Sequence, residues 1–367
     1  MIRSILLSAL CASALFAQQH AKNIILFLGD AGGIPTLNAA SIHGYQKPLA
    51  LYIQHMPHIG LSETSSTSSW VTDSAAGMTA IVTGQKTDNG VLSEDPTPEP
   101  GKRDGAPLKT ILEYAEQHGL STGVISNMPM ADATPAACYS HARRRQDFGL
   151  IFPQIWKPRF GDGVDLVLGN GRKKILDADE KLGVDTAKEL KASGRLFLDS
   201  LDAIPAGARR VVVLEDNPGF DVAAATAKAI EILSKNPKGF FLMVEWDLHP
   251  TKPARCLDTV VKLDHLIQRT ANQMDKNSLV FFTADHSFDF RLLRGKKGAD
   301  IVLPPGPNAE GADKDNVKAE VIVGTHHSGE EVLIAAAGPG SQRVHGFMPN
   351  TELFHVMMSA YGWRESR

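Results

Sequence analysis

Short apolar runs alternate with longer amphipathic stretches along most of the chain. Helical periodicity is clearest over Pro107–His118, which is followed by Gly119, and over Asp221–Leu233 and Cys256–Met274. The runs rich in Val, Ile, Leu and Phe, typical of buried strands, are Asn23–Leu28, Thr122–Ser126, Arg210–Leu214, Gly239–Val244, Ser278–Thr283 and Glu331–Ala336. Strands that alternate with helices predict an α/β fold of three layers (α/β/α), in which helices cover a central, mostly parallel sheet.

Two segments rich in Pro, Asp and Gly, Glu94–Gly105 and Pro304–Asn316, are predicted to be loops. Neither is long enough to separate two domains, and the chain contains no internal repeat. We therefore expect one compact domain over residues 18–367.

Polar side chains gather where the predicted strands end. Asp30 closes the first strand, Glu245 follows the Gly239 strand, and Asp285 with His286 follows the Ser278 strand, while Asp132 comes soon after the Thr122 strand. The carboxyl ends of parallel strands share one edge of an open sheet, which is where ligands bind. Acidic and imidazole groups from four strands should meet there, and this convergence predicts a metal site.

Composition and charge fit a large globular enzyme. The 367 residues are 43% hydrophobic, enough to bury a large core. The 38 basic and 41 acidic residues leave a formal net charge of −3, with no dominant basic block, so a nucleic-acid partner is not suggested.

The first 17 residues have the pattern of a signal peptide. Arg3 supplies a positive charge, Ile5–Phe16 is a short apolar core, and Ala17 precedes polar residues. Cys11 raises lipidation as an alternative, but the bulky Leu10 before it favours simple secretion. The apolar stretch is too short to span a membrane, and no later segment is long enough. We expect a secreted or periplasmic protein without a membrane span.

Two cysteines follow the predicted signal peptide, Cys138 and Cys256. In an exported chain they are candidates for a disulfide, and two separate buried thiols are an equally good interpretation.

The segment Trp70–Ala80 contains a candidate nucleophile. Asp73 and Ser74 precede a run of small residues that predicts a helix, which would place the serine at the positive end of the helix dipole. An ordinary helix cap explains the same two residues when the segment is considered alone.

Four further clusters carry candidate ligands. Asp132 and Thr134 offer hard oxygen atoms that suit Mg²⁺. Arg143–Arg145 contains a possible phosphate clamp, although such a run is often a solvated face. Asp285-His286 and His326-His327, both beside apolar strands, offer the nitrogen and carboxylate ligands that zinc prefers.

These segments, taken in this order from Lys22 to Gly340, resemble the alkaline phosphatase family. The run Val71–Gly84 is similar to the family's nucleophile signature, in which Asp-Ser-Ala opens a helix, and Thr83–Gly90 continues the match. The resemblance implies Ser74 as the nucleophile. It also implies Arg145 as the phosphate clamp, with Arg144 as the alternative, and Asp73 as the residue that orients it.

The resemblance further implies two Zn²⁺ ions and one Mg²⁺ ion. Asp30 would bridge Mg²⁺ and one zinc. The residues that would complete the Mg²⁺ site are Asp132, Thr134 and Glu245. The second zinc would take Asp285, His286 and, during reaction, the oxygen of Ser74. The first zinc would take Asp247, His249 and His327, with His326 as an alternative to His327.

The first zinc segment departs from the family pattern. The family spaces these ligands as Glu-x4-Asp-x3-His, whereas Glu245, Asp247 and His249 are two residues apart here. Alternate residues of an extended segment share one face, so all three side chains can still converge.

The expected activity is hydrolysis of small phosphate monoesters through a phosphoserine, and the resemblance allows a homodimer. A phosphodiesterase of the same superfamily is an alternative. A sulfatase is disfavoured because Ser74–Met78 lacks the Pro and Arg that formylglycine formation requires. A weakly catalytic phosphate- or metal-binding protein is the third interpretation.

Overall fold

The computed structural model describes residues 20–96, 105–298, 301–302 and 319–364. The predicted signal peptide with Cys11, the Pro304–Asn316 loop and most of the Glu94–Gly105 loop lie outside the described residues.

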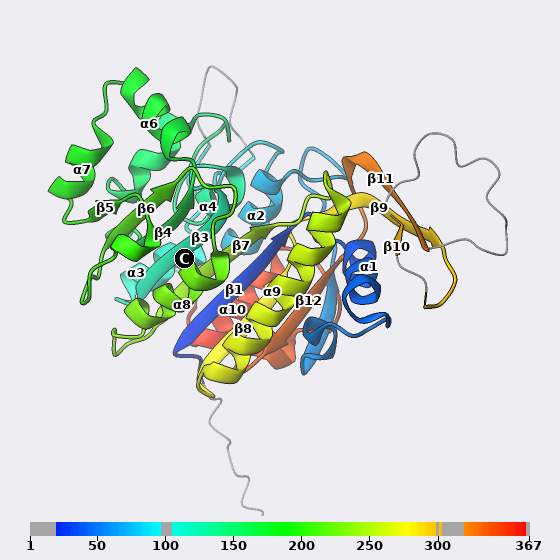
Figure 1. The fold of residues 1–367 in the computed structure, drawn as a ribbon. Coiled ribbons are helices and arrows are strands. Elements are labelled where there is room, and N and C mark those ends of the chain that lie inside the picture. Colours follow the sequence, from blue (N-terminus) through cyan, green and yellow to red (C-terminus); the bar gives the residue numbers. More distant parts are fainter. Residues whose placement is uncertain (1–19, 97–104, 299–300, 303–318, 365–367) are drawn as a thin grey trace, which may run out of the picture.

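Ten strands form one large twisted sheet in the middle of the molecule (Figure 1). In spatial order they are β13 (Gly346–Met348), β2 (His58–Ser62), β12 (Val332–Ala337), β8 (Ser278–Thr283), β1 (Asn23–Asp30), β7 (Phe240–Asp247), β3 (Ser121–Pro129), β4 (Leu166–Asn170), β6 (Val211–Glu215) and β5 (Leu196–Leu198). Only β12 runs antiparallel to its neighbours β2 and β8, so the predicted mostly parallel sheet is confirmed.

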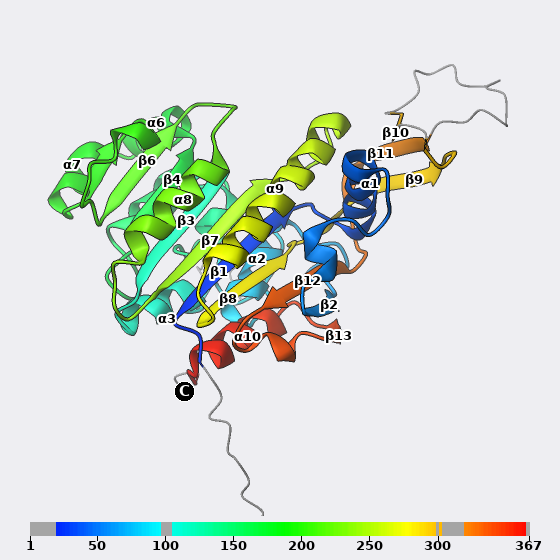
Figure 2. The ribbon, with the colours of Figure 1, turned by 60° about the horizontal axis from the view of Figure 1, so that its bottom comes forward.

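Helices cover both faces of this sheet, which confirms the three layers (Figures 1 and 2). One face packs against α1 (Ile34–Tyr45), α8 (Val222–Leu233) and α9 (Pro253–Gln273). The opposite face packs against α2 (Ser74–Thr83), α3 (Ile111–Gln117), α4 (Ala133–Ala136), α5 (Phe148–Ile151), α6 (Arg172–Lys181), α7 (Thr186–Ala192) and α10 (Glu352–Tyr361). Along β1, Leu26 and Leu28 join one core while Ile25 and Phe27 join the other, as the two-residue period of a strand requires.

A second sheet of three strands lies at one end of the molecule, beside α1 (Figure 1). Its order is β10 (Ile301–Val302), β11 (Ala319–Ser328) and β9 (Ser287–Arg294). The sequence patterns did not predict this sheet. It matters for the site because β9 leaves directly after His286 and β11 returns His327 to the same place. Short 3-10 turns complete the described structure, at η1 (Tyr52–His55), η2 (Phe152–Ile155), η3 (Leu201–Ala203) and η4 (Ser341–Arg343).

One predicted boundary was wrong. The helix expected from Pro107 begins at Ile111, because Thr110 caps it: the Thr110 side chain accepts from the Glu113 N–H, and Glu113 accepts from the Thr110 N–H. Pro107 instead forms a bridge with Glu94.

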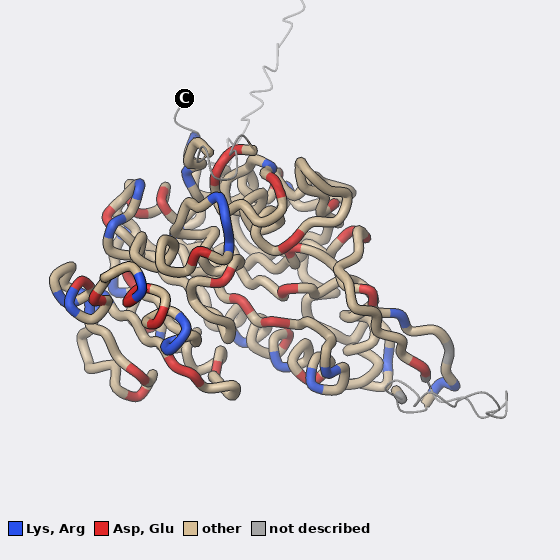
Figure 3. The backbone as a smooth tube through the Cα atoms, turned by 90° about the horizontal axis from the view of Figure 1, so that it is seen from above, with Lys and Arg blue, Asp and Glu red and all other residues tan. Residues whose placement is uncertain are grey.

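The two cysteines are separate. Cys138 and Cys256 are both buried free thiols, one beside α4 and the other on α9. Basic and acidic residues are both distributed over the backbone, as Figure 3 shows. Among the described helices, none is long and apolar enough to cross a membrane.

Candidate active site

Four neighbouring strands, β8, β1, β7 and β3, end at the same edge of the large sheet. Asp30 is the last residue of β1 and is paired in register with Asp247, the last residue of β7. Asp285 and His286 follow β8, and Asp132 follows β3 as the N-cap of α4. The convergence expected from the strand ends is present in the structure.

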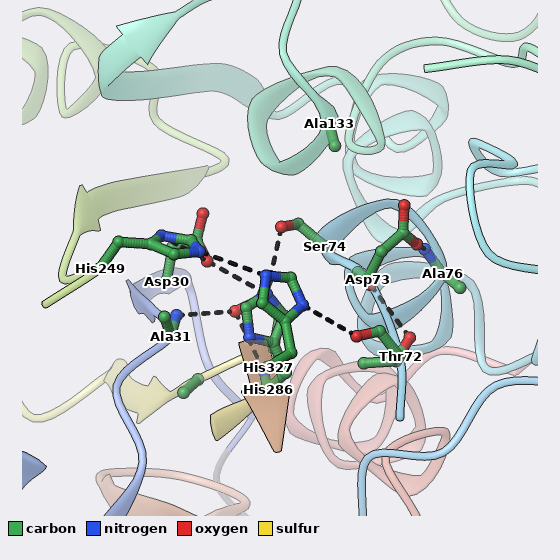
Figure 4. A network of polar contacts seen from close by, with 12 residues as sticks. Asp30, Ala31, Thr72, Asp73, Ser74, Ala76, Ala133, His249, His286 and His327 are labelled. Carbon is green, nitrogen blue, oxygen red and sulfur yellow. Dashed lines mark hydrogen bonds and ion pairs between the residues drawn. The ribbon is translucent and has the colours of Figure 1, made fainter. Parts of the chain in front are cut away.

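Ser74 is the first residue of α2 and lies buried at this edge. Asp73 caps the helix by accepting from the Ala76 N–H, and it also accepts from the Gly90 N–H in the loop after α2. Glycine at position 77 allows α2 to approach the loop after β8, since a Cβ there would be 2.8 Å from the Asp285 carbonyl oxygen. This close packing places the Ser74 hydroxyl 3.2 Å from Nε2 of His286 (Figure 4).

His286 is fully buried, and its hydrogen bonds fix its tautomer. Nδ1 lies 3.1 Å from the Ser287 carbonyl oxygen, which can only accept, so Nδ1 carries the proton. Burial lowers the pKa of His286 to about 4, with the neighbouring Asp285 charge acting in the opposite direction, so the ring is neutral. Nε2 therefore presents a lone pair.

That lone pair faces other acceptors. His286 Nε2 is 3.3 Å from Oδ1 of Asp30 and 3.4 Å from Oδ2 of Asp285. Both carboxylate oxygens are buried without a hydrogen-bond donor. Acceptor atoms that face one another in a buried space repel unless a cation lies between them. Because the His286 ring is neutral, its short distances to Asp30 and Asp285 are contacts between acceptor atoms and not ion pairs. Such contacts favour a bound cation.

A second group of candidate ligand atoms adjoins the first, because the His327 ring stacks on the His286 ring with their centroids 3.6 Å apart. His249 Nδ1 is 2.7 Å from Oδ1 of Asp247, and His327 Nδ1 is 3.0 Å from the Thr72 carbonyl oxygen. The two Nε2 atoms face each other at 3.3 Å. Burial lowers the pKa of His249, but the hydrogen bond to Asp247 and the charges of Asp247 and Asp285 together outweigh burial and the net shift is upward. All three histidines thus hold one ring nitrogen on an oxygen acceptor and aim the other inward, as metal-binding histidines do.

The carboxylates of the edge repel one another. Burial raises the pKa of Asp30 well above its usual value, and the charges of Asp285, Glu245 and Asp247 add to that shift. Burial likewise raises the pKa of Glu245 to about 8, although a hydrogen bond from the Ser126 hydroxyl opposes the shift. This excess of negative charge is what divalent cations would neutralise.

Arg145 is the cationic side chain that contacts these acids directly. Its two terminal nitrogens lie 3.0 Å from Oδ2 of Asp73 and 3.1 Å from Oδ1 of Asp132. Burial lowers the pKa of Arg145, but Asp132 and Asp73 outweigh burial and the net shift is upward. The guanidinium is held in a fixed orientation between the helix that carries Ser74 and the loop after β3.

The residues proposed for Mg²⁺ lie around this arginine. Asp132 is half-buried, whereas Thr134 and Glu245 are almost completely buried, at 2% and 1% exposed. The Asp132 charge is one of the causes that raise the pKa of Glu245, which reflects their proximity. Hard oxygen atoms of this kind fit Mg²⁺.

The structure also separates the alternatives that the sequence left open. His327 faces His249, whereas His326 is exposed. Arg145 contacts the acidic cluster, whereas Arg144 points toward Asp147 at 4.0 Å and is largely exposed. The compressed segment does converge: Asp247 and His249 lie with Asp30 in one group of candidate ligands.

Sequence reasoning missed the residues that hold the ligands in place. Ser126 donates to Glu245, and the side-chain oxygen of Asn127 accepts from the Asp247 N–H. The only available signal in the sequence was that Ser126 and Asn127 lie at the end of the Thr122 strand, where the acids were also predicted to gather.

Comparison with known proteins identifies relatives of this chain. The sequence model of the family described as alkaline phosphatase matches residues 21–202 and 216–304, which is more than half of the chain. The alkaline phosphatase of Escherichia fergusonii is 30% identical over 93% of this chain and 86% of its own length. The human tissue-nonspecific isozyme of alkaline phosphatase is 26% identical over 93% of this chain and 83% of its own length.

Solved structures match as well. A variant of TAB5 alkaline phosphatase, described as having Mg bound in its M3 site, is 25% identical and has a TM-score of 0.78. The match covers 95% of this chain and 100% of that one. Thermus thermophilus alkaline phosphatase has the same fold at 20% identity, with a TM-score of 0.77. The chain described here therefore belongs to the alkaline phosphatase family and is a phosphomonoesterase.

Proposed function

We propose that this enzyme hydrolyses phosphate monoesters through a phosphoserine on Ser74, with two zinc ions and one magnesium ion. The observation that carries the proposal is the ring of acceptors beside Ser74. Oδ1 of Asp30 and Oδ2 of Asp285 are buried without a donor, and both lie within 3.4 Å of Nε2 of His286, to which the Ser74 hydroxyl can donate.

Three sets of residues would hold the ions. The set beside Ser74 is Asp30, Asp285 and His286. The second zinc set is Asp247, His249 and His327, and the Mg²⁺ set is Asp30, Asp132, Thr134 and Glu245. Ions bound there would supply Lewis-acid stabilisation of the reacting oxygens and would lower the pKa of a bound hydroxyl.

Ser74 acts as the nucleophile from the N-terminus of α2. Its hydroxyl oxygen attacks phosphorus in line with the leaving oxygen, and the helix dipole favours the negative charge that accumulates there. Arg145 binds two phosphoryl oxygens and positions the group for attack. Asp73 and Asp132 hold the guanidinium in that orientation, which reduces the entropy lost on binding.

The leaving alcohol departs on the side away from Ser74, toward His249. Water then attacks the phosphoserine from that same side and releases inorganic phosphate. The burial of Ser74 and His286 keeps the nucleophile's side of the site dry, whereas the half-buried His249 leaves an entry for water and substrate.

We further propose that residues 18–367 form a single catalytic domain. Residues 1–17 would direct the chain out of the cytoplasm, to the periplasm or the medium. Small phosphate esters are the proposed substrates, and a homodimer is the assembly that the resemblance implies.

The Ser74→Ala variant tests the nucleophile. Turnover of 4-nitrophenyl phosphate should fall by about 10³-fold or more, because the change removes the hydroxyl that attacks phosphorus. Metal content should stay at the wild-type level, because His286, Asp30 and Asp285 remain.

Ser234→Ala, at the exposed end of α8, is the matched control and should keep full activity. Activity of Ser74→Ala within tenfold of wild type would reject the phosphoserine. Faster turnover of bis(4-nitrophenyl) phosphate than of the monoester by the wild-type enzyme would favour a diesterase instead.

A further inference from the structure

A cavity of about 300 Å³ opens beside His249, on the face of the sheet that α9 covers. Segments from three parts of the chain form it: the end of β3, the loop after β6, and the stretch from β7 into the first turns of α9. Its lining consists of Asn127, Met128, Pro218, Trp246, Asp247, His249, Thr251, Lys252, Arg255, Cys256 and Thr259. Its volume is at the lower end of the range for small-molecule sites.

The cavity is continuous with the catalytic cluster because Asp247 and His249 line both. Ser74 contacts the opposite part of the cluster, through His286. In-line displacement places the attacking and leaving oxygens on opposite sides of phosphorus. An alcohol that leaves away from Ser74 therefore passes His249 and enters the cavity.

The outer part of the cavity is positively charged. Lys252 and Arg255 are both exposed there, and neither forms an ion pair with a carboxylate within the described part of the chain. Arg255 donates to the Pro218 carbonyl oxygen at 2.8 Å, which fixes one end of the guanidinium and leaves its other N–H groups available. The first turn of α9 contains no acidic residue that would offset these charges.

The inner part of the cavity has a different character. Asp247 carries the only negative charge in the lining, and its Oδ1 is engaged by the ring of His249. Trp246, Met128 and Pro218 add apolar side chains to the lining. The cavity therefore combines a contact with the catalytic cluster, apolar side chains and two cations without carboxylate partners among the described residues.

We propose that this cavity binds the alcohol part of the substrate, and that Lys252 and Arg255 select esters whose alcohol carries a second anionic group. A short carbon skeleton would lie against Trp246 and Met128, while a carboxylate or second phosphate pairs with the two cations. This inference rests on the proposed function, because it assigns the cavity to the leaving group of that reaction.

Two esters with the same carbon skeleton test the inference. In 3-phosphoglycerate the leaving alcohol carries a carboxylate, and in glycerol 3-phosphate it carries a neutral hydroxymethyl group. The double variant Lys252→Gln, Arg255→Gln should lower the ratio of kcat/KM for 3-phosphoglycerate to that for glycerol 3-phosphate by about tenfold. Lys252→Gln alone should lower it by about threefold. Added salt should lower the wild-type ratio in the same direction.

Lys262→Gln, Arg269→Gln is the matched control, because it removes the same two charges from exposed positions farther along α9. This variant should leave the ratio unchanged. The Lys252 side chain makes no hydrogen bond to any described residue, so its single variant tests the charge without loosening the Pro218 loop.

A ratio that stays within twofold of wild type in both the single and the double variant would overturn the inference, as would an equal fall in the control variant. Wild-type hydrolysis of both esters that is lost in Ser74→Ala would keep the proposed function intact in either case. Hydrolysis of neither ester by the wild-type enzyme would contradict the proposed function and the inference together.

Discussion

Two clusters of acids, most of them buried or half-buried, lie at opposite edges of the large sheet. At the amino edge, Glu116, Asp162 and Asp165 lie beside the starts of β3 and β4. At the carboxyl edge, the acids are Asp30, Asp132, Glu245, Asp247 and Asp285. The two clusters contain similar groups but differ in how their charge is balanced.

The amino edge is neutralised by the protein itself. Arg210 lies 3.2 Å from Asp162 and 3.2 Å from Asp165, and Arg195 is buried beside them. Glu116 accepts from the Gly163 N–H at 3.0 Å. At the carboxyl edge, Arg145 directly contacts one of the five acids, Asp132, and Oδ1 of Asp30 and Oδ2 of Asp285 have no donor.

This difference indicates that the carboxyl edge, and not the amino edge, requires external cations. Buried acids that pair with arginines of the same chain have a structural role, because removing one partner leaves the other charge unpaired in a medium of low dielectric constant. Buried acids without cations destabilise the fold until an external cation binds. A cation-binding role of the carboxyl edge can therefore be inferred from carboxylate oxygens that have no partner among the described residues.

The comparison is tested most strongly by replacing one acid at each edge. Asp285→Asn should lower activity by about 10²- to 10³-fold, because it removes a carboxylate ligand from the set beside Ser74. In the metal-free protein the same change should raise the free energy of unfolding by about 1–3 kcal/mol, because an unpartnered buried oxygen is replaced by a donor. Activity assays and denaturant unfolding with and without chelator measure both effects.

Asp165→Asn is the matched change at the amino edge. It should lower the free energy of unfolding by about 1–3 kcal/mol whether or not metal is present, because Arg210 loses a partner. If Asp285→Asn also destabilised the metal-free protein, the two edges would not differ as described.

Arg145→Lys should have the next largest effect. The guanidinium contacts Asp73 and Asp132 with separate nitrogens, and an ammonium cannot reproduce that geometry. We expect kcat/KM to fall by about 10- to 100-fold and inorganic phosphate to inhibit more weakly. Arg144→Lys, at an exposed position, is the control and should behave as wild type. Equal losses of kcat/KM in Arg145→Lys and Arg144→Lys would show that Arg145 does not bind the phosphate.

Glu116→Gln should have the smallest effect on activity of these changes, because it should alter only the free energy of unfolding. Burial raises the pKa of Glu116 from 4.5 to about 8, although the Gly163 N–H opposes the shift. The folded protein therefore keeps the proton that the unfolded chain loses. Stability from this group is present below about pH 4.5 and is lost as the pH rises to about 8.

In Glu116→Gln this pH-dependent loss should disappear, a change on the order of a few kcal/mol by pH 8. Denaturant unfolding at pH 5 and pH 8, with wild type in parallel, measures it. If the free energies of unfolding of wild type and Glu116→Gln differed by the same amount at pH 5 and pH 8, Glu116 would be ionised in the folded protein.

Much of the fold and of the site was predictable from short-range patterns. The apolar runs that contain Leu26 and Phe281 lie within strands with both faces buried, so their composition alone identified β1 and β8. Since parallel strands end at one edge, Asp30 and Asp285 could be placed together without any knowledge of their neighbours.

The remaining features depend on long-range packing. The three-stranded sheet that positions His327 depends on pairing between β9 and β11, and its register shifts between Val323 and His327. The close approach of α2 to Asp285 requires Gly77, which carries no periodic signal. The convergence of Asp247 and His249 could not be decided from spacing, because β7 extends farther than its apolar run and places Asp247 opposite Asp30.

The central claim is that cations occupy the gaps between facing acceptors at the carboxyl edge. Anomalous diffraction at the zinc absorption edge, from crystals of the metal-loaded enzyme, tests it directly. We predict one peak shared by His286, Asp30 and Asp285 beside Ser74, and a second between the inward nitrogens of His249 and His327. Direct contact between those nitrogens with no anomalous peak in either gap, in an enzyme that still turns over, would contradict the account.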